Sequence, residues 1–101
     1  MKTYVGVLTI RLETPWVRSL KEKRAIVRPV MERVKARFPV SAARLDGLNE
    51  HAWEKVGFSV IGNDAEWAAG VLQKVEDYLR AAGEYRLVVC EREVFVFEGQ
   101  D

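Results

Sequence analysis

Residues 19–38, SLKEKRAIVRPVMERVKARF, predict the first helix of the protein. Ser19 and Glu22 have the spacing of a capping box, in which each side chain accepts a hydrogen bond from a free backbone N–H of the first turn. Pro29 lies inside the segment, but the apolar stripe continues past it, so we expect a kink there rather than a helix end. The stripe follows the helical period and consists of Leu20, Val27, Val30, Met31, Val34 and Phe38.

The segments outside this helix are mainly typical of strands. A second helix is expected to begin after Asp64 and to end near Gly83. Residues 47–54 are expected to form a loop, and strands are expected at 3–13, 40–46, 55–62 and 85–97. The order β-α-β-β-α-β is typical of the ferredoxin-like split β-α-β arrangement. We therefore predict an α+β fold, with two helices on one face of an antiparallel sheet, and a single domain over residues 1–101.

The charge of the chain is distributed unevenly. Residues 18–37 hold eight cations and two anions, a balance of +6, whereas the rest of the chain holds eight cations and thirteen anions, a balance of −5. Such polarity bears on the choice of partner more than on the fold. Asn and Gln are scarce while Arg, Glu and Val are plentiful, a composition that hints at a thermophilic source.

The compartment is predicted from what the sequence lacks. No apolar run approaches the roughly 18–20 residues of a membrane span, and the N-terminus does not have the pattern of a secretory signal. Cys90 is the single cysteine, so a disulfide framework is excluded, and its apolar surroundings predict a buried small side chain. We expect a cytoplasmic protein with no membrane partner.

The basic helix is the main candidate for a binding site. With 100° per residue, Lys21, Arg24 and Arg28 fall together with Lys35 at roughly 40–100° from Leu20. Cations at a helix N-terminus are unfavourable, whereas the free N–H groups there attract phosphate. One hypothesis is an anion or RNA-backbone site, and the other is a solvated face whose cations pair with the acidic remainder. One tryptophan just before the helix cap and another in the predicted loop after the second strand could each stack on a base. The candidate site comprises Arg18, Lys21, Lys23, Arg24, Arg28, Lys35, Trp16 and Trp53.

Signatures of a reaction, a metal or a cofactor are missing from the sequence. His51 is the single histidine, and without a second ligand motif it predicts a surface loop residue. No P-loop, dinucleotide-binding motif or zinc spacing occurs. We therefore expect no enzymatic activity, no metal and no cofactor.

The C-terminal segment VFVF, residues 94–97, suggests a different role. Four apolar strand-forming residues on an exposed edge would invite aggregation, so they should be covered. Either the last strand continues against the first strand, or it pairs with a second chain. We predict a homodimer with an interface at Val94, Phe95, Val96 and Phe97.

Three stretches together resemble the YlxP-like family of small bacterial proteins. They are SLKEKRAIVRPVMERVKARFPVSAARLD (19–46), Trp53 and VGFSVIGND (56–64), and the match covers nearly the whole chain. The resemblance implies a ferredoxin-like fold and no assigned activity. Genes of this family tend to lie among translation and ribosome-maturation genes, which implies a connection with the ribosome or its RNA. Many relatives carry an acid where this chain has Arg44, a departure that puts the role of that acid in doubt here.

Two functions therefore stay open. The first is a cytosolic binding module that contacts ribosomal RNA or the ribosome through the basic helix. The alternative is a self-associating scaffold or small-ligand-binding domain, in which the basic helix contributes only solubility. A hydrolase of phosphorylated or acylated molecules is compatible with the fold, but the loop after the first strand lacks the glycines of a phosphate cradle.

Overall fold

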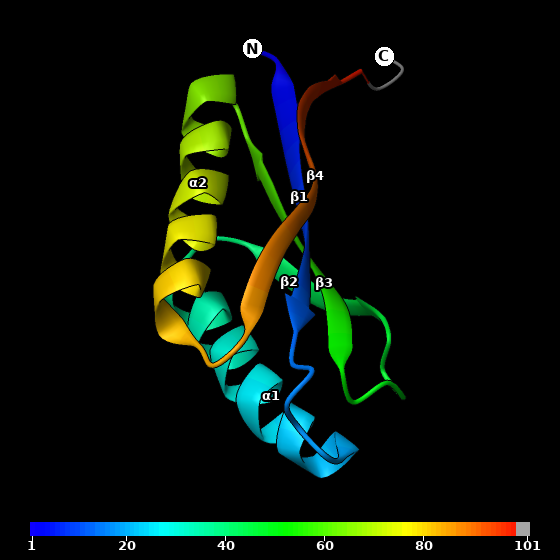
Figure 1. Cartoon of the computed structure of the whole chain (residues 1–101). Helices are drawn as coiled ribbons and strands as arrows, with labels where there is room; N and C mark the ends of the chain where they lie inside the picture. Colours follow the sequence, from blue (N-terminus) through cyan, green and yellow to red (C-terminus); the bar gives the residue numbers. More distant parts are fainter. Residues whose placement is uncertain (99–101) are drawn as a thin grey trace.

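The computed structural model describes residues 1–98 and contains four strands and two helices in the order β-α-β-β-α-β (Figure 1). Ser19 caps the first helix by accepting a hydrogen bond from the N–H of Glu22, and Asp64 caps the second in the same way. No helix in this range is long and apolar enough to cross a membrane. The elements are β1 Thr3–Glu13, α1 Leu20–Arg37, β2 Ser41–Asp46, β3 Trp53–Gly62, α2 Ala65–Ala82 and β4 Arg86–Phe97.

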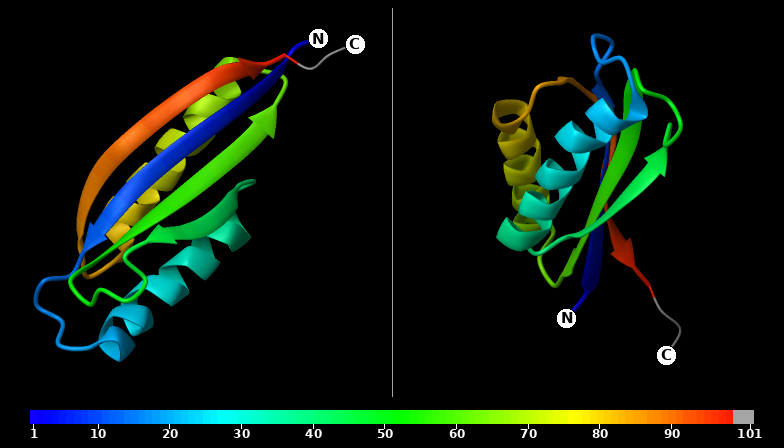
Figure 2. Two further views of the ribbon diagram at one scale, coloured as in Figure 1. Left: turned by 90° about the vertical axis from the view of Figure 1, so that its right-hand side faces the viewer. Right: turned by 90° about the horizontal axis from the view of Figure 1, so that it is seen from below.

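The four strands form one antiparallel sheet in the order β2-β3-β1-β4. Both helices lie on the same side of this sheet, and its other side carries no element (Figure 2). This arrangement confirms the predicted ferredoxin-like fold. It also leaves β2 and β4 as the two edges of the sheet, with α1 beside β2 and α2 nearer to β4.

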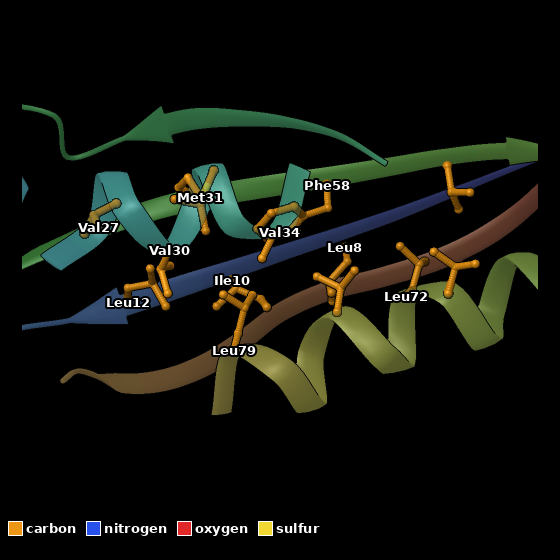
Figure 3. Packing of buried hydrophobic residues seen from close by; sticks show 14 of the residues in the cluster. Leu8, Ile10, Leu12, Val27, Val30, Met31, Val34, Phe58, Leu72 and Leu79 are labelled. Carbon is orange, nitrogen blue, oxygen red and sulfur yellow. The ribbon is translucent and has the colours of Figure 1, made fainter. Parts of the chain in front are cut away.

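The core lies between the sheet and the two helices (Figure 3). Leu8, Ile10 and Leu12 point from β1 toward the helices because alternate residues of a strand share one face. Gly6 continues this row, and a Cβ there would lie 3.0 Å from Leu72 of α2, so the missing side chain allows the helix to approach closely. The predicted apolar stripe of α1 supplies Val27, Val30, Met31 and Val34 to the same core.

The predicted elements are confirmed, with small differences at their ends. Helix α1 continues through Pro29, which is exposed, so the proline does not stop the helix. Strand β3 begins at Trp53, which was expected in the loop. Strand β4 runs through its charged middle, and the register with β1 shifts between Thr9 and Ile10. Cys90 lies at this irregularity on an edge strand and is exposed, so the expectation of a buried cysteine is wrong.

The VFVF segment extends β4 along β1, which is one of the two predicted ways to cover it. Val94 faces the helices and packs against the core. Phe95 lies opposite Val5 on the other side of the sheet, and its exposed fraction is 39%. Phe97 is 59% exposed. The pairing of β4 with β1 therefore covers this segment only in part.

Candidate nucleic-acid interface

Helix α1 carries four cations along one side, which we call the basic stripe: Lys21, Arg24, Arg28 and Lys35. Lys21, Arg24 and Arg28 line one surface hollow together with Pro29. Arg28 and Lys35 line the next hollow, which lies between α1 and the edge strand β2. The two hollows share Arg28, so the stripe runs along two neighbouring surface hollows. The structure thus brings together the four residues that the helical projection grouped.

The second hollow is strongly basic. It has a volume of about 380 Å³ and is lined by Arg28, Lys35 and Arg44, with Glu32 as the acid among its lining residues. Met31 and the small side chains of Ala42 and Ala43 form the rest of its wall. An anion that entered it would meet cations from both α1 and β2.

Most cations of this surface have no acidic partner. Within residues 1–98, no carboxylate oxygen lies within 4.0 Å of the side-chain nitrogens of Arg18, Lys21, Arg24 or Arg28. Lys35 pairs at 3.2 Å with Glu32 of the same helix. The Nε atom of Arg24 is buried and has no hydrogen-bond partner in the described part of the chain. A buried N–H without a partner is costly, so contacts within the described chain do not account for the position of this guanidinium group.

Lys23 does not belong to this surface, and its assignment to the binding site is corrected here. Its side chain is fully buried, and its Nζ lies 3.0 Å from Glu54 Oε1. The same Nζ donates to the carbonyl oxygen of Gly47 at 2.7 Å, with those of Leu48 and Trp53 at 3.5 and 3.4 Å. Lys23 therefore fixes the loop between β2 and β3 to the start of α1.

The sequence contained a signal for this burial. In the same projection Lys23 falls at about 300°, inside the arc from about 280° to 20° that the buried valines and Met31 occupy. A cation in the middle of an apolar face needs a buried partner. Glu54, the partner, is the second residue of β3 and points toward the helices beside Val56. Its position could not be predicted, because residues 47–54 were expected to form a loop.

Arg44 completes a buried charge cluster, which we call the Glu54 triad: Lys23, Arg44 and Glu54. Arg44 Nε and Nη2 donate to the two oxygens of Glu54 at 2.5 and 2.7 Å. This hydrogen bonding raises the pKa of Arg44. Two cations share one anion, so the triad keeps an excess positive charge, and Arg44 directs it toward the hollow beside α1. The residue that departs from the resembled family's pattern is thus an ion-pair partner of Glu54.

The remaining candidates occupy separate places. Trp16 is 54% exposed in the segment before α1. The ring of Trp53 lies 4.1 Å from the guanidinium carbon of Arg11, a cation–π contact that occupies one of its faces. Arg18 is exposed beside the Ser19 cap. His51 is exposed in the loop as predicted, and no group of three potential metal ligands occurs in the described chain.

The Glu54 triad predicts a loss of stability in acid. Burial alone would raise the pKa of Glu54, but the hydrogen bonds and the charges of Arg44 and Lys23 together outweigh burial, so the pKa lies below the ordinary value of 4.5. A lowered folded-state pKa stabilises the protein above about pH 4.5, and this contribution is lost as the pH falls through the folded-state value. We expect the stability difference between the wild type and Glu54→Gln, measured by urea unfolding, to shrink below pH 4.5. A difference that stays constant to pH 2.5 would contradict this coupling.

The comparisons with known proteins agree with a small protein whose activity is not assigned. A search of curated proteins finds no significant match to the chain. One family model matches residues 5–92, a range that contains the basic stripe, the Glu54 triad and most of the sheet. The chain belongs to the family described as protein of unknown function, DUF503.

Proposed function

We propose that this protein is an RNA-binding module that contacts phosphate groups through the basic stripe of α1. One observation carries the proposal: Lys21, Arg24 and Arg28 line one hollow, and none of them has an acidic partner within the described residues. Phosphate contacts of this kind supply most of the sequence-independent affinity for nucleic acids. The role proposed is binding and not catalysis.

The pattern of ion pairs favours this proposal over a merely solvated face. If the cations served to balance the acidic remainder of the chain, they should pair with it. Within residues 1–98, Lys23 is the one cation of the eight in residues 18–37 that forms an ion pair with an acid outside its own helix. Arg33 donates instead to the hydroxyl of Tyr78, and Arg37 lies over the ring of the same tyrosine. Lys21, Arg24 and Arg28 of the stripe have no acidic partner within residues 1–98 and are left for another partner.

The length of the stripe suits a nucleic-acid strand. Fourteen residue steps separate Lys21 from Lys35, which at about 1.5 Å per residue is about 21 Å along the helix axis. One strand of a B-form duplex rises about 3.4 Å per nucleotide, so a distance of this length spans several phosphates of a nucleic-acid strand. The resemblance to the YlxP-like family, whose genes accompany ribosome-maturation genes, supports ribosomal RNA as the class of target.

Charge reversal on the stripe should abolish binding to ribosomal subunits and to a structured ribosomal RNA fragment. We expect the Lys21→Glu, Arg24→Glu, Arg28→Glu variant to bind at least about a hundredfold more weakly, because each lost contact costs about 1 kcal/mol or more. Affinity would be measured by filter binding at low salt, with circular dichroism to confirm the fold.

A matched variant separates local contacts from total charge. Lys2→Glu, Lys74→Glu, Arg80→Glu produces the same change in net charge on exposed residues outside α1. This variant should keep most of the affinity. If both variants weaken binding equally, or if the wild type binds neither subunits nor RNA, the proposal is wrong, and a scaffold or small-ligand function takes its place.

A further inference from the structure

We call the side of the sheet that faces away from the helices the open face (Figure 2). Its side chains are apolar at one end. The register places Ile61 and Phe95 on either side of Val5, with Val7 next along β1. Ile61 is 68% exposed, and Phe97 and Phe95 are also exposed. Large apolar side chains gathered on one surface of a small protein indicate an interaction site.

The open face also contains a shallow apolar hollow. It has a volume of about 200 Å³ and is lined by Val7, Ala43 and Leu45, with Gly57 at its base. The side chain of Leu45 lies against Gly57. A Cβ added to Gly57 would be 2.6 Å from Leu45 Cδ1. The face therefore has projecting aromatic side chains on β4 and a depression toward β2.

We propose that the open face binds the same face of a second copy of this chain, which forms a symmetric homodimer. A two-fold axis in the plane between two such sheets can place Phe95 of each copy over the hollow of the other. An isologous interface of this kind needs a surface that is complementary to itself. The open face provides that complementarity, because it carries both the projecting Phe95 side chain and the hollow.

The charges of the open face select a second copy over other partners. Across its four strands it carries three cations and four anions: Arg11, Lys55, Arg86, Asp46, Glu13, Glu91 and Glu93. Five of the seven already take part in ion pairs: Arg11 and Arg86 with Glu13, and Lys55 with Glu91. Two copies would meet here with little net repulsion, whereas a nucleic acid would find no excess positive charge. The basic stripe lies on the helical side and stays free.

The size of the open face also fits a dimer. Strands about 4.8 Å apart and about 3.3 Å per residue give four strands of about ten residues a projected area of roughly 600 Å². Because side chains project from the sheet, the accessible surface area of the open face is larger than this projected area. It approaches the roughly 800 Å² per partner that stable interfaces bury.

Sedimentation velocity on the full chain tests the dimer between about 1 and 100 µM. The wild type should sediment as a dimer. Ile61→Asp and Phe95→Asp should each weaken association by at least about 30-fold, because each would bury a charge within the apolar part of the interface. Thermal melts followed by circular dichroism would show that both variants fold.

Leu48→Asp is the matched control, because Leu48 is 40% exposed but lies in the loop outside the sheet. It should remain dimeric. A monomeric wild type at 100 µM would overturn the proposal and leave the face to a different partner or to none. A dimer that persists in Ile61→Asp and Phe95→Asp would place the interface elsewhere and also overturn it. Neither result bears on the RNA proposal.

Discussion

Replacement of Glu54 by alanine should destabilise the protein by about 3–5 kcal/mol, the cost of breaking a buried ion pair. Lys23 would keep its charge in the core, where its side chain is fully buried, and would lose its anionic partner 3.0 Å away. Arg44 would lose both of its hydrogen bonds to the same carboxylate. Urea unfolding at pH 7, followed by circular dichroism, measures the difference in the free energy of unfolding.

Two further variants show whether the cost comes from the uncompensated charge. Glu13→Ala removes a half-exposed acid that forms surface ion pairs, and it should cost less than about 1 kcal/mol. Lys23→Met combined with Glu54→Leu should recover part of the loss, because apolar pairs can replace buried ion pairs. The recovery stays partial, since the carbonyl oxygen of Gly47 loses its donor. A loss below about 1 kcal/mol in Glu54→Ala would contradict this account.

Replacement of Gly47 by alanine should destabilise the protein by about 2–4 kcal/mol. Gly47 has a φ of +72°, in the left-handed region that side chains disfavour. An added Cβ would also lie 2.6 Å from the ring of Trp53. Backbone strain and overpacking each cost roughly 1–3 kcal/mol. Thermal and urea unfolding of the variant would measure the effect.

Gly70→Ala makes the same substitution in a helix and should stabilise the protein. Gly70 lies inside α2, and beyond its chain neighbours and the backbone of its own helix no atom is within 4 Å of the place that its Cβ would occupy. Alanine in a helix interior is favoured over glycine by roughly 0.5–1 kcal/mol, so this variant should be more stable than the wild type. If Gly47→Ala were as stable as Gly70→Ala, the loop between β2 and β3 would not be held as described.

The fold could be predicted because its signals are local. The capping residues Ser19 and Asp64, the apolar stripe of α1 and the alternation of β1 each identify one element. The order of these elements along the chain is then compatible with few arrangements of the sheet and the helices. The ends of the elements were harder to predict, because they depend on tertiary contacts. Trp53, for example, belongs to β3 because it pairs with Glu13 of β1, and no local pattern indicates this pairing.

The site could be predicted only in part. The helical projection grouped the four residues of the basic stripe, since their placement depends on α1 alone. Lys23 was assigned to the surface because it is charged, although the helical projection places it on the apolar side of α1. The Glu54 triad joins residues from α1, β2 and β3, and contacts between distant segments carry no local signal.

The SLKEKR stretch therefore serves two purposes. Lys23 is directed inward, where Glu54 and the carbonyl oxygens of Gly47, Leu48 and Trp53 stabilise its charge at the positive end of the helix. Lys21 and Arg24 are directed outward and keep their charge for a ligand. The repulsion that such cations cause at a helix start is offset inside the protein by the triad, and outside it by the phosphate partner that we propose.

The salt dependence of RNA binding tests the central claim most directly. For a single-stranded RNA oligonucleotide, four phosphate contacts predict a slope of about −2.8 for the logarithm of the association constant against the logarithm of salt concentration. Each of Lys21→Gln, Arg24→Gln and Arg28→Gln should reduce the magnitude of that slope by about 0.7. Slopes that stay at the wild-type value in all three variants would show that the basic stripe of α1 does not bind the phosphates.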